Sequence, residues 1–117
     1  MINIYGRLVP LMLLVASCAS MHESKDFERH RNSQLEVPYD RDDVFYFDAS
    51  FTAQYPDNDE AAEAVRLEWL SEWLEQRSLC PDGFDVVTRR PFEFLEHNPA
   101  RHDVRYEVKC KSAPPDA

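Results

Sequence analysis

The stretch SLCPDGFDVVTRRPFEFLEHNPARHDVRYEVKCK, residues 78–111, decides the fold. Residues 84–90 are rich in β-branched side chains, and residues 102–111 alternate between apolar and polar ones, so each is predicted to be a strand. The Pro81-Asp82-Gly83 sequence before the first strand is typical of a turn. With residues 91–101 as the connection, these two strands predict an antiparallel hairpin.

Three patterns select the same register for this hairpin. Apolar side chains face each other, an acidic side chain faces a basic one, and two cysteines become opposite. The implied partners are Phe84 and Tyr106, Val86 and Val104, Asp85 and Arg105, and Cys80 and Cys110. We therefore predict a disulfide between Cys80 and Cys110, which would close a loop of about 30 residues and add about 3.5 kcal/mol of stability. Two widely separated cysteines without a CxxC pair do not favour a zinc site.

A strand and a helix are predicted upstream of the hairpin. Residues 44–55 alternate between apolar and polar side chains, and Pro56 ends the pattern. Asp57-Asn58-Asp59-Glu60 then supplies capping and first-turn acidic residues for a helix that runs to about Ser78. Its broad apolar face, predicted to cover the sheet, comprises Ala62, Val65, Leu67, Trp69, Leu70, Trp73 and Leu74.

Together these elements predict one small α+β domain over residues 44–117. Its order is β-α-β-β, with a three-stranded antiparallel sheet, one helix packed on one face and one disulfide. A right-handed crossover places the C-terminal strand in the centre. Residues 18–43 are polar and lack apolar periodicity, so we predict a flexible tether there. The alternatives are that part of this stretch packs on the domain through Phe27, Leu35, Val37 or Tyr39, and that residues 24–31 form a short helix.

The N-terminal segment, residues 1–17, has the pattern of an export signal. Arg7 precedes the apolar run of residues 8–16, and small residues follow. An apolar run of this length would rise only about 14 Å as a helix, too short to cross a hydrocarbon core of about 30 Å.

The sequence Val15-Ala16-Ser17-Cys18 resembles the lipobox of bacterial lipoproteins. That resemblance implies that Cys18 is lipidated, with acyl chains such as palmitate, and becomes the first residue of the mature chain. Ala19, where an aspartate would favour the inner membrane, resembles the sorting pattern of lipoproteins of the outer membrane. The resemblance thus implies a cell-envelope protein, anchored in the outer membrane and facing the periplasm.

From the helix onward, the chain is similar to small, uncharacterised proteobacterial lipoproteins. The shared features are a Trp-Leu pair in the helix, an LCP-G turn and a terminal RY-x-x-x-C strand. The matching residues are Trp73, Leu74, Leu79, Cys80, Pro81, Gly83, Arg105, Tyr106 and Cys110. This resemblance supports the disulfide and the fold, and it implies no activity.

The net charge restricts the partners. The whole chain carries −9, and Arg7 is the only charged side chain before Cys18, so the exported part has 12 basic and 22 acidic side chains and carries −10. Such a surface is repelled by nucleic acids and by anionic headgroups. We therefore expect no nucleic-acid partner, and we expect the lipid anchor alone to hold the protein on the membrane.

No catalytic motif is recognisable. His97 and His102 lie near Glu93 and Glu96 in the sequence, but no HExxH, phosphate-binding glycine loop or GxSxG pattern organises them. We therefore predict neither an enzyme nor a metal or cofactor site.

The function predicted is that of a binding or accessory module. Phe92, Phe94 and Leu95 make the hairpin loop apolar, and we expect them to contact an envelope protein. Two other interpretations of these residues are that they extend the strand or pack back on the core. The alternative is a domain that binds a small molecule or a metal through Arg66, Arg77 or the loop histidines. Arg66 and Arg77 fall within the apolar arc of the helix, where stems extended toward the sheet edge would also explain them.

Overall fold

The computed structural model describes residues 25–112, so the predicted signal peptide (1–17) and Cys18 lie outside the described residues. The chain divides after Arg31 into two compact units. The described part of the first unit is helical, and this helix extends over residues 25–32, close to the short helix considered for residues 24–31. Within it, Arg29 forms an ion pair with Asp26 at 3.5 Å.

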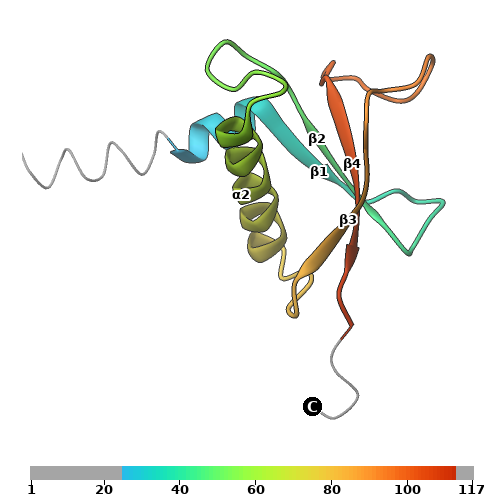
Figure 1. Cartoon of the computed structure of the whole chain (residues 1–117). Helices are drawn as coiled ribbons and strands as arrows, with labels where there is room; N and C mark the ends of the chain where they lie inside the picture. The colour runs from blue at the N-terminus through green and yellow to red at the C-terminus, as the bar shows by residue number, and fades with distance from the viewer. Residues whose placement is uncertain (1–24, 113–117) are drawn as a thin grey trace, which may run out of the picture. The chain divides into compact units, whose positions relative to one another are not determined.

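The second unit is a four-stranded antiparallel sheet with helix α2 (Glu60–Gln76) along one face (Figure 1). The strands are β1 (Ser33–Glu36), β2 (Phe45–Ala49), β3 (Phe84–Arg90) and β4 (Val104–Cys110), in the order β1-β2-β4-β3. The α+β class is confirmed, and β4 lies between β2 and β3 as predicted. The prediction of three strands is wrong, because β1 forms a fourth.

Strand β1 lies within the stretch predicted to be a flexible tether, so that prediction is wrong for residues 33–36. Leu35 pairs with Phe47 of β2 and is buried in the core. Trp73 of α2 donates its indole N–H to the buried Ser33 hydroxyl at 3.0 Å. The sequence did not predict this strand, because four residues with one apolar side chain show no periodicity. Its stability comes instead from tertiary contacts, which local sequence does not reveal.

Strand β2 ends at Ala49, not at Tyr55 as the alternation predicted. Ala49 pairs with Val104, the first residue of β4, so no neighbouring β4 residue continues the ladder beyond it. A turn follows, in which Tyr55 N–H donates to the Thr52 hydroxyl at 3.0 Å. Tyr55 still packs on the core, with its ring centroid 5.0 Å from that of Trp69. The apolar alternation therefore identifies core contacts such as Phe47 and Tyr55, but it does not give the strand length, and Ala53 is exposed.

Helix α2 begins at Asp59, whose side chain accepts hydrogen bonds from the amides of Ala61 and Ala62. Its core face carries the predicted side chains, with Val65 and Leu67 only partly buried. The Tyr106 hydroxyl of β4 donates to Glu63 of the helix, which joins helix and sheet. Burial, together with this bond, raises the pKa of Tyr106 to about 12.

We expect Asp59→Ala to lower the free energy of unfolding by about 1 kcal/mol, because two amides of the first helical turn lose their acceptor. Urea unfolding measures the effect. Asp42→Ala is the matched control, since Asp42 is exposed and outside every helix and strand. A loss of equal size in both variants would contradict the capping role.

Arg66 is fully buried on the core side of α2. Its guanidinium donates to the carbonyl oxygens of Tyr55 and Pro56, both at 3.1 Å, and lies 5.2 Å from the centre of the Phe51 ring. Arg66 therefore fastens the β2–α2 loop. The expectation that its stem extends toward the sheet edge is wrong, because the whole side chain is buried.

The Cys80–Cys110 disulfide is present, with the two Cα atoms 4.8 Å apart. The strand register that led to it is wrong, because Cys80 precedes β3 and reaches Cys110 through a turn. In this turn Gly83 N–H donates to the Cys80 carbonyl at 3.0 Å, and Lys111 N–H donates to the Gly83 carbonyl at 2.9 Å. The observed partners are Phe84 and Cys110, Asp85 and Lys109, Val86 and Val108, Thr88 and Glu107, Arg89 and Tyr106, and Arg90 and Arg105.

The predicted Asp85–Arg105 pair is therefore absent. The register also shifts between Val86 and Thr88, as in a β-bulge. A bulge in an exposed edge strand hinders pairing with another chain.

Candidate functional site

The face of the sheet opposite α2 carries a buried ion cluster, which we call the Arg105 cluster: Glu36, Asp48, Glu96 and Arg105. Asp48 and Arg105 are direct cross-strand partners of β2 and β4, and they are 0% and 3% exposed. The Arg105 guanidinium donates to both oxygens of Asp48, at 2.8 and 3.0 Å. It also donates to Glu96 at 3.0 Å and to Glu36 at 3.1 Å.

Two loops cover this face, so the polar side chains that the alternation placed in solvent are largely enclosed. Figure 1 shows the β1–β2 loop and the β3–β4 loop on the side of the sheet away from α2. The ring centres of Tyr46 and Phe92 lie 4.3 and 4.8 Å from the Arg105 guanidinium carbon. Of the loop residues predicted to contact a partner, Phe92 thus packs against the domain itself.

Glu96 fastens the β3–β4 loop. Arg90 and Arg105 are cross-strand partners with the same charge, an arrangement that is unfavourable unless an anion lies between them. Glu96 supplies this anion, accepting from Arg90 through both oxygens at 2.8 Å and from Arg105 at 3.0 Å. The hydrogen bonds from Arg90 lower the pKa of Glu96 to about 2.

This pKa predicts how acid affects stability. A carboxyl with a lowered folded-state pKa contributes stability above its unfolded pKa of about 4.5 and loses it as the pH falls toward about 2. We expect Glu96→Gln to be less stable than wild type at pH 7 by about 2–3 kcal/mol. The difference should shrink as the pH falls from 4.5 to 2, in urea unfolding at several pH values. Glu93→Gln, an exposed neighbour, is the control, and a pH-independent difference for Glu96→Gln would contradict the assignment.

The C-terminal part of the same loop is held by His102 and Asn98. The Asn98 side chain bonds both the amide and the carbonyl of His102, each at 2.9 Å. His102 is 8% exposed, and its Nδ1 lies 2.8 Å from the Ser50 hydroxyl. Burial lowers the pKa of His102, so its neutral form stabilises the fold above pH 6.5 and this contribution is lost as the pH falls below it.

The Ser50–His102 contact has the separation of a nucleophile and its base, and sequence reasoning did not single out Ser50. Among residues 25–112, however, no carboxylate is hydrogen-bonded to the other ring nitrogen of His102 to complete a triad. The contact joins the end of β2 to the β3–β4 loop.

Phe94 and Leu95 form the tip of the loop and are 93% and 88% exposed. Glu96 N–H donates to the Glu93 carbonyl at 3.1 Å, closing a tight turn around them. Leu95 has φ 70°, in the left-handed region that favours glycine, at a cost of about 1–2 kcal/mol. The turn thus holds two apolar side chains in solvent. Backbone strain of this kind is typical of functional segments.

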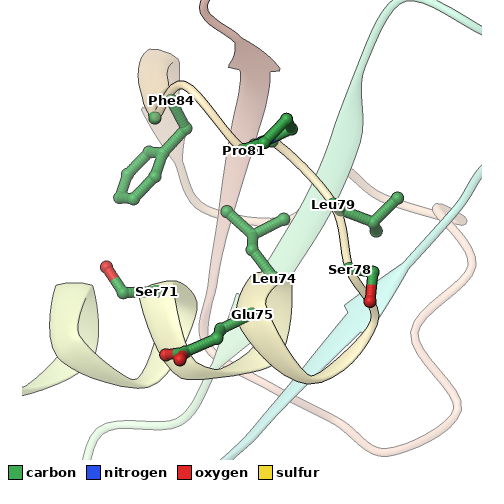
Figure 2. Close-up of a pocket in the computed structure, with 9 residues that line it drawn as sticks. Ser71, Leu74, Glu75, Ser78, Leu79, Pro81 and Phe84 are labelled. Atoms are coloured by element: carbon green, nitrogen blue, oxygen red, sulfur yellow. The ribbon is translucent and has the colours of Figure 1, made fainter.

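A second feature is an apolar cleft of about 460 Å³ between the C-terminal end of α2 and the disulfide turn. Figure 2 shows Leu74, Pro81 and Phe84 along its walls, with Ser71 and Glu75 of α2 beside them. The cleft depends on the turn that carries Cys80, because the same turn brings Pro81 and Phe84 over the helix.

The other side chains considered for ligand binding are dispersed. Arg77 lies with its guanidinium carbon 5.5 Å from the centre of the Trp73 ring. His97 is exposed, whereas His102 is buried. In the described part of the chain no three metal-binding side chains form a group. Over those same residues, 25–112, no helix has the length and hydrophobicity needed to cross a membrane.

No protein family, no curated protein and no solved structure matches this chain.

Proposed function

We propose that this protein is a non-enzymatic, lipid-anchored module of the cell envelope that binds another protein through the tip of its β3–β4 loop. The observation that carries the proposal is the exposure of Phe94 and Leu95 on a loop fastened at Glu96 and His102. Apolar side chains on a pre-organised loop lose little conformational entropy on binding, so they are effective contacts. The strained φ at Leu95 supports the same role. Glycine adopts this backbone conformation without strain, so glycine would be the better residue here if stability were the only requirement.

The cellular address rests on the lipobox-like sequence at Cys18 and is supported by the disulfide. Disulfides persist in oxidising compartments and are common in small exported domains. The net charge of the exported part leaves the lipid as its attachment to an anionic membrane. Cys18→Ala should release the exported chain into the soluble fraction, and a variant that still sediments with membranes would contradict the anchor.

Photo-crosslinking in intact cells tests the binding site. A crosslinker at position 94 of the full-length protein should yield an adduct with one specific envelope protein. The same group at Glu68, on the exposed face of α2, is the matched control and should not yield it.

A second substitution separates binding from folding. Leu95→Gly removes the apolar contact but relieves the backbone, so it should abolish the adduct at position 94 without lowering the free energy of unfolding. Adducts that are identical from positions 68 and 94, or that persist in Leu95→Gly, would overturn the proposal.

A small-molecule-binding function has one observation in its favour, the apolar cleft beside the disulfide. Its volume of about 460 Å³ lies within the range of ligand pockets, roughly 300–1,000 Å³. Native mass spectrometry of the purified full-length protein tests this function. A bound small molecule lost on Ser71→Trp, which places a bulky ring at the cleft from an exposed position, would support it, whereas an unliganded mass would contradict it.

A further inference from the structure

A second cleft, of about 510 Å³, lies over the Arg105 cluster. We call it the Tyr39 cleft, and it opens between the β1–β2 loop and the β3–β4 loop. Tyr46 and Arg105 lie at its floor, Glu36 and Glu96 along its sides, and Tyr39 and His97 at its rim. It is thus a concave site on the same face as the loop with the exposed tip.

The floor of the cleft already binds a guanidinium. Arg105 is surrounded by carboxylates and by the Tyr46 ring, which are the groups that recognise arginine and lysine side chains. Its own charge is neutralised by these partners, so the floor offers no free cation to an anionic ligand.

The charge balance around the cleft favours a further cation. The acidic groups here are Glu36, Asp48, Glu96 and Glu107, and they outnumber Arg41, Arg90 and Arg105, the basic groups that they bind. Asp40, also lining the cleft, adds another negative charge. Among the described residues its carboxylate has no ion-pair partner.

The rim adds an exposed aromatic surface. Tyr39 is fully exposed, and its hydroxyl has no hydrogen bond to the part of the chain that the structure describes. A cation over a tyrosine ring gains roughly 0.5–1 kcal/mol at an exposed site and more when it is desolvated. Asp40, next in sequence, can bind the same cation through its carboxylate.

We infer that the Tyr39 cleft receives an arginine or lysine side chain from a basic segment of a partner protein. This inference rests on the proposed function, because it identifies the chemistry of the partner that the loop tip contacts. The net charge of −10 on the exported part would also accelerate association with a basic partner at low ionic strength.

The experiment titrates the full-length protein, in neutral detergent micelles, with N-acetyl-arginine amide and follows backbone amide resonances by NMR. We expect saturable shifts confined to residues 36–46, 96–97 and 105. The neutral isostere N-acetyl-citrulline amide should cause none of them. Asp40→Asn and Tyr39→Ala should each weaken binding at least threefold, which is about 0.65 kcal/mol.

Asp42→Asn is the matched control, because it removes the same charge from the same loop outside the cleft. The inference is overturned if the shifts do not saturate, if citrulline reproduces them, or if Asp42→Asn weakens binding as much as Asp40→Asn. The titration does not involve Phe94. An adduct at position 94 without an arginine response would therefore refute this inference alone, and the converse would refute the proposed function alone.

Discussion

Replacing Arg105 with methionine is expected to lower the free energy of unfolding by about 3–5 kcal/mol, because it leaves the buried Asp48 carboxylate without its cation. Asp48 is 0% exposed, so solvent cannot replace the lost hydrogen bonds. The methionine side chain keeps much of the arginine stem, so lost packing accounts for little of the effect. The measurement is urea unfolding at pH 7.

Lys109→Met is the matched control. Lys109 lies four residues after Arg105 in β4 and on the same face of the sheet, but its side chain is exposed. A change within about 0.5 kcal/mol is expected there. Adding Asp48→Leu to Arg105→Met should recover a large part of the loss, because an apolar pair replaces an uncompensated charge. If Arg105→Met alone costs less than about 1 kcal/mol, the Arg105 cluster does not have the energetic role assigned to it.

This cluster also marks what the sequence could not reveal. Alternation in β4 placed Arg105 on the face opposite Tyr106, which is correct. It did not reveal that two loops cover that face, because local periodicity contains no information on long-range loop packing. Phe92 was singled out for its hydrophobicity, and its partner turned out to be Arg105 within the same domain.

The hairpin shows a related limit. The observed partners before the bulge differ from the predicted ones by four residues, so Phe84 pairs with Cys110 instead of Tyr106. Side chains alternate with a period of two, so a shift by an even number of residues leaves the same side chains on the same face. The apolar pattern therefore identified the faces but could not choose between these two registers.

The helix was predictable because several signals agreed. The capping residue Asp59 and the apolar face around Trp69 and Leu70 act over short sequence distances, where intrinsic preference and burial coincide. The short strand β1 had neither signal. Of the candidate site, Phe94 and Leu95 were predictable from composition, whereas the Tyr39 cleft requires the packing of two loops.

Removing the disulfide is the second change with a large expected effect. Cys80→Ala combined with Cys110→Ala should lower the free energy of unfolding by about 3.5 kcal/mol. The disulfide joins residues 30 positions apart, and without it the denatured chain regains the conformational freedom that this crosslink had removed. Small domains have total stabilities of about 5–15 kcal/mol, so this is a large fraction. The wild type in a reducing buffer should unfold at the same urea concentration as the double variant, and the reductant should not affect the double variant further.

The positions at which the double variant loses hydrogen-exchange protection distinguish the observed strand register from the predicted one. Cys80 lies before β3, so the Val86–Val108 pairing does not need the disulfide. Hydrogen exchange of the double variant should therefore stay slow at β4 amides next to β2. It should accelerate, beyond the global change, at Gly83 and Lys111, whose bonds close the disulfide turn. Acceleration spread evenly over β3 and β4 would instead indicate that the disulfide sets the strand pairing, and unchanged stability in the double variant would contradict its stabilising role.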